Sequence, residues 1–316
     1  MKKIIKFLKD WTLIVAMLSG TIGYFVFANI PLMEPLKPIT MTLIEFLTPT
    51  LIFTQLLLTF CKIEPRDLLP KRWNLWLLMI QFFTCMAVGL ALIFLPINDA
   101  YRGVWEGLMV TLICPTATAA AVITGKLGGN PASLITYTLL CNLLCAVVVP
   151  LLFPLVELQE GMTFITAFLK ILSKVFPLLL VPFLLAMLLR YCLPTIHKAL
   201  LKIHNLSFYL WAVALTIVTA QTVRSLVNSP YTIDIIALTA LAGLISCLFQ
   251  FFVGRRIGAR YGERISAGQS IGQKNTVLAI WMSYTYLNPI ASIAPGSYVV
   301  WQNIINTWQL WRQRIT

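Results

Sequence analysis

Residues 266–281 read Ser-Ala-Gly-Gln-Ser-Ile-Gly-Gln-Lys-Asn-Thr-Val-Leu-Ala-Ile-Trp, and they place Lys274 inside a long apolar region. The region is long enough to cross a membrane, but Gly and polar residues interrupt it near its middle. An ionisable group at bilayer depth is costly, so it usually faces a partner, a cavity or a substrate. An interrupted membrane helix is tolerated only where its freed backbone lines such a cavity or is buried in protein. Together these features predict a transport site.

The composition agrees with a membrane protein. Of 316 residues, 59% are hydrophobic and 11% are charged, and the mean hydropathy is +0.85. Soluble domains carry about 25% charged residues. We therefore expect an all-α polytopic membrane protein with short loops and no soluble domain.

Cysteine and histidine give no sign of a metal or catalytic site. The seven cysteines lie in or at the ends of apolar segments without metal-ligand spacing, which favours a packing role. The two histidines, His197 and His204, fall in a basic segment expected to be a loop. We expect no catalytic residues, no bound metal and no enzyme activity.

A spanning helix needs about 20 mostly apolar residues. Ten candidates meet this requirement, at about 11–30, 40–60, 74–96, 104–124, 133–155, 164–191, 206–225, 233–253, 265–286 and 290–311. The first follows a basic start but is long for a signal peptide and lacks a clear cleavage site, so we interpret it as a span.

Basic residues predict the orientation. With the N-terminus inside, the outer segments hold only Lys37, Arg102 and Arg224. The inner segments hold 18 basic residues: Lys2, Lys3, Lys6, Lys9, Lys62, Arg66, Lys71, Arg72, Lys126, Arg190, Lys198, Lys202, Arg255, Arg256, Arg260, Arg264, Arg312 and Arg314. This asymmetry places both termini in the cytoplasm. It also explains the net charge of +13 without nucleic-acid binding.

The chain has the pattern of an internal repeat. Cys114-Pro-Thr-Ala-Thr-Ala-Ala-Ala121 interrupts the fourth predicted span, and Ser270-Ile-Gly-Gln-Lys-Asn-Thr276 interrupts the ninth. Each is the fourth span of a five-span half, so the halves 1–160 and 161–316 would enter the membrane from opposite sides. Such paired interruptions point to a midplane binding site. The alternative is that Pro and Gly merely kink ordinary helices.

The interruptions expose backbone amides, and the half-helix N-termini carry partial positive charge that suits an anion. Polar residues surround them: Thr116, Thr118, Ser270, Gln273, Lys274, Asn275 and Thr276, with Gln81, Thr138, Asn142, Gln302 and Asn303 on other spans. The pair Gln302 and Asn303 is expected to interrupt the tenth span. A single amide side chain in a membrane helix also commonly forms hydrogen bonds that hold neighbouring helices together. This structural role is the alternative for Gln81, Asn142 and this pair.

Carboxylates are absent from the predicted site. Glu45 and Glu106 are the only ones inside spans, and both fall near the outer ends, where they can reach water. A sodium ion needs oxygen ligands, often including a carboxylate.

These segments resemble the bile acid:sodium symporter superfamily in its bacterial ten-span form. The similarity covers nearly the whole chain and is strongest in residues 114–124, 272–279 and 294–303, and residues 58–67 also resemble the end of the family's second span. The resemblance implies a panel of spans 1, 2, 6 and 7, and a core of spans 3–5 and 8–10 in which broken helices 4 and 9 cross. It also implies organic anions as substrates, a multi-pass location in the bacterial inner membrane, and sodium coupling in many members.

The residue-by-residue match implies both a substrate site and lost sodium ligands. Thr118, Asn275 and Asn303 match positions that touch substrate, and Gln302 stands where a His is common. Ala120 and Ala121 replace the Ser and Asn sodium ligands, Ser270 replaces a Glu, and Lys274 replaces a Gln, while Gln81 matches a retained third-span ligand.

We therefore expect a secondary transporter of small or medium organic anions that works by alternating access in the lipid bilayer. It would be independent of sodium, with Lys274 substituting for a bound cation and no cofactor. A permanently charged Lys274 would attract an anion, whereas a titrating one would couple transport to protons. The alternatives are a sodium-coupled symporter, a non-transporting membrane sensor on the same scaffold, a membrane enzyme or assembly factor, and a channel.

Overall fold

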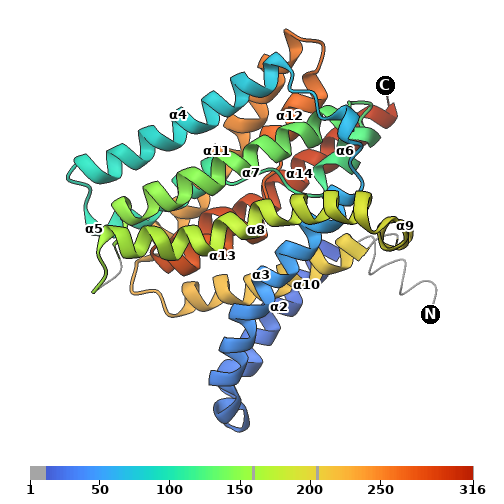
Figure 1. The fold of residues 1–316 in the computed structure, drawn as a ribbon. Helices are drawn as coiled ribbons and strands as arrows, with labels where there is room; N and C mark the ends of the chain where they lie inside the picture. Colours follow the sequence, from blue (N-terminus) through green and yellow to red (C-terminus); the bar gives the residue numbers. More distant parts are fainter. Residues whose placement is uncertain (1–11, 159–160, 204–205, 316) are drawn as a thin grey trace.

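The computed structural model describes residues 12–158, 161–203 and 206–315. Lys2, Lys3, Lys6, Lys9 and His204 lie outside these ranges. The described chain is helical throughout (Figure 1). The α-helices are α2 (Thr12–Asn29), α3 (Lys37–Cys61), α4 (Arg72–Phe94), α5 (Asp99–Ile113), α6 (Ala120–Lys126), α7 (Pro131–Val156), α8 (Phe164–Cys192), α9 (Pro194–Lys202), α10 (Leu206–Val227), α11 (Ile233–Ala259), α12 (Arg264–Gly272), α13 (Thr276–Tyr286) and α14 (Ile293–Ile315). Short 3-10 helices occupy Pro31–Leu36 (η1), Pro65–Asp67 (η2) and Pro289–Ser292 (η3).

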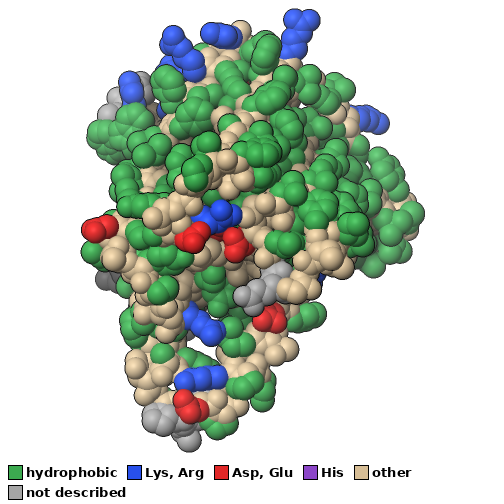
Figure 2. Space-filling view, turned by 90° about the vertical axis from the view of Figure 1, so that its left-hand side faces the viewer, with side chains coloured by type: hydrophobic (Ala, Val, Ile, Leu, Met, Phe, Trp, Pro, Cys, Tyr) green, Lys and Arg blue, Asp and Glu red, His purple; other side chains and the backbone are tan. Residues whose placement is uncertain are grey.

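The protein is a multi-pass membrane protein. Within the described residues, seven helical segments are long and apolar enough to cross a membrane. They correspond to the predicted spans 1, 2, 3, 5, 6, 7 and 8. Large apolar side chains such as Phe46, Phe94 and Phe252 are more than two-thirds exposed, which is the arrangement expected of a surface in contact with lipid. Apolar side chains cover much of the face shown in Figure 2, and basic side chains gather at its upper end.

The three remaining predicted spans have a different form. The fourth consists of α5 and α6, the ninth consists of α12 and α13, and each of these pieces is too short to span a bilayer alone. The tenth consists of η3 and α14, which has 23 residues but a more polar sequence. The total of ten spans and the division at residue 160 therefore stay predictions.

Three local expectations were wrong. Gln302 and Asn303 do not interrupt their helix, because α14 is continuous and the Asn303 Nδ2 group donates to the Val299 carbonyl one turn earlier, at 2.6 Å. His197 lies in helix α9 and not in a loop. It is buried, with its Nε2 atom 2.9 Å from the Cys61 carbonyl oxygen.

Glu106 does not reach water, which is the third correction. Its side chain is fully buried, and its Oε2 atom accepts a hydrogen bond of 3.0 Å from the Asn288 backbone N–H. The bond joins α5 to the segment that precedes η3. Glu45, in contrast, is exposed on α3 as expected.

The helices form two groups in contact. Helices α2, α3, α8 and α10 pack together, whereas α11 packs against α5, α12 and α14. Helix α7 contacts α8 of the first group and α4 and α12 of the second. In Figure 1 the α2–α3 pair extends toward the lower end of the molecule, away from α4, α11 and α12. The broken helices lie in the second group.

Helix α2 packs against α10 through a face of small residues. Ala16 and Gly20 are its buried residues, one helical turn apart. A Cβ atom on Gly20 would lie 2.3 Å from the Thr216 carbonyl oxygen, so the backbones of α2 and α10 are too close for any side chain there. Gly23, one turn along, has no neighbouring atom within 4 Å of such a Cβ.

We predict that Gly20→Ala lowers the thermal unfolding temperature of the detergent-purified protein, because α2 must move away from α10. Gly23→Ala is the matched control and should leave the temperature unchanged or raise it, since alanine favours helix by about 1 kcal/mol over glycine. Tryptophan fluorescence reports unfolding. Equal temperatures for the two variants would contradict the close packing.

Candidate functional site: the crossing of two broken helices

The two helix breaks meet in space as a pair of extended segments. Residues between α5 and α6 run antiparallel to those between α12 and α13, with Thr116 opposite Lys274. The Ala117 N–H donates to the Gln273 carbonyl at 2.9 Å, and the Asn275 N–H donates to the Pro115 carbonyl at 2.8 Å. The breaks cover residues 114–119 and 273–275, which is shorter than the predicted 114–121 and 270–276.

Local sequence accounts for both breaks. Cys114 precedes Pro115, and a residue before proline avoids helical backbone angles, so Cys114 has ψ 137° and α5 ends before it. Gly272 ends α12 where the Phe251 ring of α11 lies only 2.5 Å from the position of a Cβ atom. A side chain at 272 would therefore collide with that ring.

Lys274 lies at the carboxyl end of α5. Its side chain is 1% exposed, and its Nζ atom donates to the carbonyls of Cys114 at 2.7 Å and Leu112 at 3.2 Å. Among the described side chains, no carboxylate forms an ion pair with it. The last carbonyls of a helix lack partners within the helix and carry partial negative charge. The ammonium group therefore occupies the position where a cation stabilises the end of α5.

Gln81 of α4 satisfies the remaining carbonyls. Its Nε2 atom donates to the carbonyls of Ile113 at 2.7 Å and Cys114 at 3.3 Å. Its Oε1 atom accepts from the Tyr137 hydroxyl at 2.6 Å. Lys274 and Gln81 thus share the three consecutive carbonyls of residues 112–114. The Lys274 Nζ atom thus donates to backbone carbonyls and not to the polar side chains of Gln81, Ser270 or Thr118.

The end of α12 is capped from the opposite segment. The Thr116 hydroxyl donates to the Ser270 carbonyl at 2.6 Å, and the Tyr298 hydroxyl of α14 donates to the Gly272 carbonyl at 2.8 Å. Ser270 precedes Lys274 by four residues, as Leu112 precedes Thr116. Each residue of the Thr116–Lys274 pair therefore caps the carbonyl that lies four residues before its partner. This exchange locks the two half-helices to each other.

The predicted substrate residues have different surroundings. The Asn275 Oδ1 atom caps α13 by accepting from the Leu278 N–H at 3.2 Å. The Gln302 Oε1 atom accepts from the Lys274 backbone N–H at 2.9 Å, so Gln302 supports the crossing directly. Thr118 is half-buried in the turn that precedes α6. The Asn303 amide is hydrogen-bonded within its own helix, and it makes no hydrogen bond to the crossing segments in the described part of the chain.

The predicted cation-site equivalents surround the same segments. Ala120 is buried and Ala121 half-buried in the first turn of α6, and neither side chain offers an oxygen. Ser270 is fully buried, and its hydroxyl finds no hydrogen-bond partner in the described part of the chain. Asn142 of α7 is likewise buried with both amide atoms unpartnered among those residues. A buried amide without a hydrogen-bond partner is energetically costly, so a polar group that formed a hydrogen bond with Asn142 would be stabilised there.

A buried ladder of amides extends from the crossing along α12 and α14. The Gln273 amide group donates to Gln269 and to Asn306, and Gln269 donates to Asn306 at 3.3 Å and Gln309 at 3.0 Å. Gln269 and Asn306 were not singled out from the sequence, although Gln269 lies one helical turn before Gln273. Tyr137 and Tyr298 were also missed, because aromatic residues in apolar segments resemble ordinary packing residues.

The helical fold and the crossing of two broken helices are features of membrane transporters. A comparison with known protein families points to the same class of protein. The SBF-like CPA transporter family, which is related to the bile acid:sodium symporters, matches residues 44–305. The match covers most of the 316 residues, so the chain belongs to this family. No curated protein matches the chain.

We predict that Lys274→Met lowers the free energy of unfolding by about 1–3 kcal/mol, because the buried Leu112 and Cys114 carbonyls lose a donor. Lys126→Met, at an exposed lysine on α6, is the matched control and should change stability little. Denaturant or thermal unfolding in detergent measures both. If Lys274→Met is as stable as Lys126→Met, Lys274 does not cap α5.

Proposed function

We propose that the protein is a secondary transporter of small or medium organic anions, that it works by alternating access, and that sodium does not drive it. Membership of a membrane transporter family supports the general activity. The observation that carries the specific proposal is the Lys274 ammonium on the carbonyls of Leu112 and Cys114. A fixed positive charge there takes the place of a dissociable cation.

The surrounding side chains do not fit a sodium site. A hard cation needs several oxygen ligands, and those oxygens must be accessible to the ion. Ala120 and Ala121 supply methyl groups, and the oxygens at the end of α5 already accept from Lys274 and Gln81. Ser270 supplies one hydroxyl but no negative charge. A sodium ion would have to displace the ammonium group.

The same arrangement favours an anion beside the crossing. The start of α6 has no side-chain cap, because its N-cap residue, Ala119, has no polar side-chain group. Asn275 caps α13 with its oxygen only, and its Nδ2 group makes no hydrogen bond to the described residues. An acidic substrate group beside Thr118 and Asn275 would meet donors and a positive charge without a competing carboxylate. Gln302 would act indirectly by holding the Lys274 backbone, and Asn303 would have to leave its intrahelical bond to reach substrate.

Architecture supports the rocking movement that alternating access requires. We assign α2, α3, α8 and α10 to the panel, and the group containing the broken helices to the core. The reciprocal bonds between Thr116 and Ser270, and between Lys274 and Leu112, fit two inverted halves at 1–160 and 161–316. We further propose the inner membrane of a bacterium, with both chain ends in the cytoplasm.

Uptake into proteoliposomes tests the ion dependence. Labelled taurocholate and labelled pyruvate serve as large and small carboxylate probes, with sodium and pH gradients varied separately. We expect uptake of at least one probe to be unchanged when choline replaces sodium. Uptake abolished by that replacement would favour the sodium-coupled alternative, and absence of uptake for a wider set of carboxylates would favour a sensor.

A pair of variants at position 275 separates substrate binding from helix capping. Asn275→Ser keeps a side-chain oxygen that can cap α13 but removes the amide donor. We predict that it weakens binding of the transported probe by about 1–3 kcal/mol with little loss of thermal stability. Asn275→Ala should lose both binding and stability. Unchanged probe affinity in the serine variant would remove Asn275 from the substrate site.

A further inference from the structure

A pocket separate from the crossing lies in the wedge between α2 and α3. Among the described residues these consecutive helices make few contacts with each other, although both pack on α10. The pocket has a volume of about 480 Å³, and the residues that line it belong to these three helices, apart from Asn228, which directly follows α10. Near the lower end of the face in Figure 2, a hollow opens with basic side chains on both sides.

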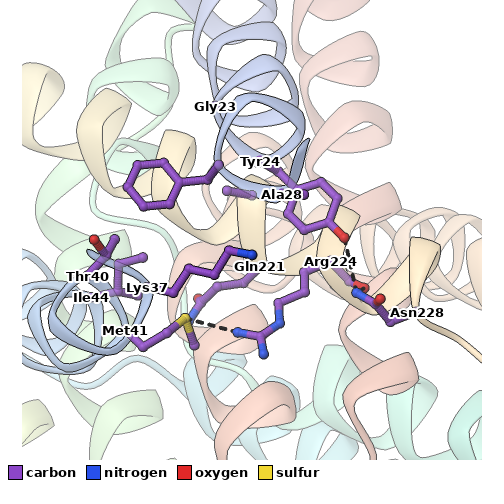
Figure 3. Close-up of a pocket in the computed structure, with 12 residues that line it drawn as sticks. Gly23, Tyr24, Ala28, Lys37, Thr40, Met41, Ile44, Gln221, Arg224 and Asn228 are labelled. Atoms are coloured by element: carbon purple, nitrogen blue, oxygen red, sulfur yellow. Dashed lines mark hydrogen bonds between the residues drawn. The ribbon is translucent and has the colours of Figure 1, made fainter. Parts of the chain in front are cut away.

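Two cations face this pocket. Lys37 reaches into it from the first turn of α3, and Arg224 reaches into it from the last turns of α10, with Gln221 between them (Figure 3). These are two of the three basic residues expected in the outer segments. Basic residues are rare on the outer side of membrane proteins, so their convergence on one pocket needs a reason.

Neither cation is strongly neutralised. Lys37 pairs with Glu34 at 3.1 Å, but the Lys37 side chain is 41% exposed and the Glu34 side chain is 70% exposed, and such solvent-screened pairs contribute little. Arg224 Nη1 lies 2.9 Å from the Met41 sulfur, a weak acceptor, and it forms no ion pair with any described carboxylate. The pocket is thus electropositive and has room for an acidic group.

A buried group independently points to a ligand. Gln221 is 6% exposed and lines the pocket, and its Oε1 atom has no hydrogen-bond partner among the described residues. A buried acceptor without a donor is costly. A ligand that carries a hydroxyl as well as an acidic group would satisfy Gln221 and both cations at once.

The walls favour a lipid over a soluble anion. Phe27 of α2 and Ile44 of α3 line the pocket on its apolar side. Next to them, Val26 and Leu43 are exposed by 40% and 55% on helices that cross the membrane, so the apolar wall continues into the lipid-facing surface. Polar groups gather at the helix ends, where the Tyr24 hydroxyl oxygen accepts a hydrogen bond of 3.1 Å from the Asn228 Nδ2 group (Figure 3).

We propose that this pocket binds an anionic phospholipid whose headgroup carries a hydroxyl, and that the lipid bridges the α2–α3 pair to α10. The phosphate lies between Lys37 and Arg224, the hydroxyl donates to Gln221, and an acyl chain follows Phe27 and Ile44. The proposal is independent of the transported substrate, because no residue of the crossing lines the pocket.

Native mass spectrometry of the full-length protein tests the proposal. Protein released from nanodiscs of phosphatidylcholine mixed with phosphatidylglycerol should retain one phosphatidylglycerol in preference to phosphatidylcholine. The double variant Lys37→Gln/Arg224→Gln should reduce that occupancy about tenfold. Lys174→Gln removes an exposed charge on α8 outside the pocket and is the matched control. Equal retention of the two lipids by the unaltered protein, or unchanged retention by the double variant, would overturn the proposal.

Two further variants test the pocket without changing its charge. Gly23→Leu places a side chain in the open space of the pocket and should displace the lipid, while the α2–α10 contact at Gly20 stays intact. Gln221→Leu should lower phosphatidylglycerol occupancy without lowering stability in lipid-free detergent. If instead soluble laurate or inorganic phosphate raises the unfolding temperature through Lys37 and Arg224 and no lipid is retained, the pocket is a soluble-anion site and the lipid assignment is wrong.

Discussion

The architecture depends on how the protein satisfies the carbonyl groups that are freed when a helix ends inside a membrane. Water is absent at that depth, and a freed carbonyl without a donor is costly. At the end of α5, the Lys274 ammonium and the Gln81 amide donate to the carbonyls of residues 112–114. At the end of α12, Thr116 and Tyr298 perform the same task. Each break therefore depends on the opposite segment, with further donors supplied by α4 and α14.

This interdependence links the fold to the proposed activity. The crossing is expected to remain intact as a unit during the proposed alternating access, because separating the segments would remove donors from the carbonyls of Leu112, Pro115, Ser270 and Gln273. Movement is then expected between this unit and the α2, α3, α8 and α10 group. A lysine differs from a bound ion in that it cannot leave the site. In the proposed mechanism a charged Lys274 would therefore stay in place throughout the cycle, and sodium would not drive transport.

The sequence predicted the helix breaks because their signals are local. Pro115 follows the end of α5 and Gly272 is the last residue of α12, while a lysine inside a long apolar region indicates burial with a partner. The acceptors of Lys274 could not be predicted, because they come from α5, some 160 residues away. Tyr137 and Tyr298 were missed for a related reason: their role depends on which carbonyl their hydroxyl meets in space. The pocket at Lys37 and Arg224 likewise requires the divergence of α2 and α3, which no local pattern encodes.

The central claim is that the Lys274 ammonium occupies the position of a cation. A high-resolution experimental structure in sodium-containing buffer tests it most directly. The account predicts density for the Lys274 Nζ atom within hydrogen-bond distance of the Cys114 and Leu112 carbonyls, with no ion between Gln81 and α5. An ion coordinated by those carbonyls, with Lys274 turned away from them, would contradict the account.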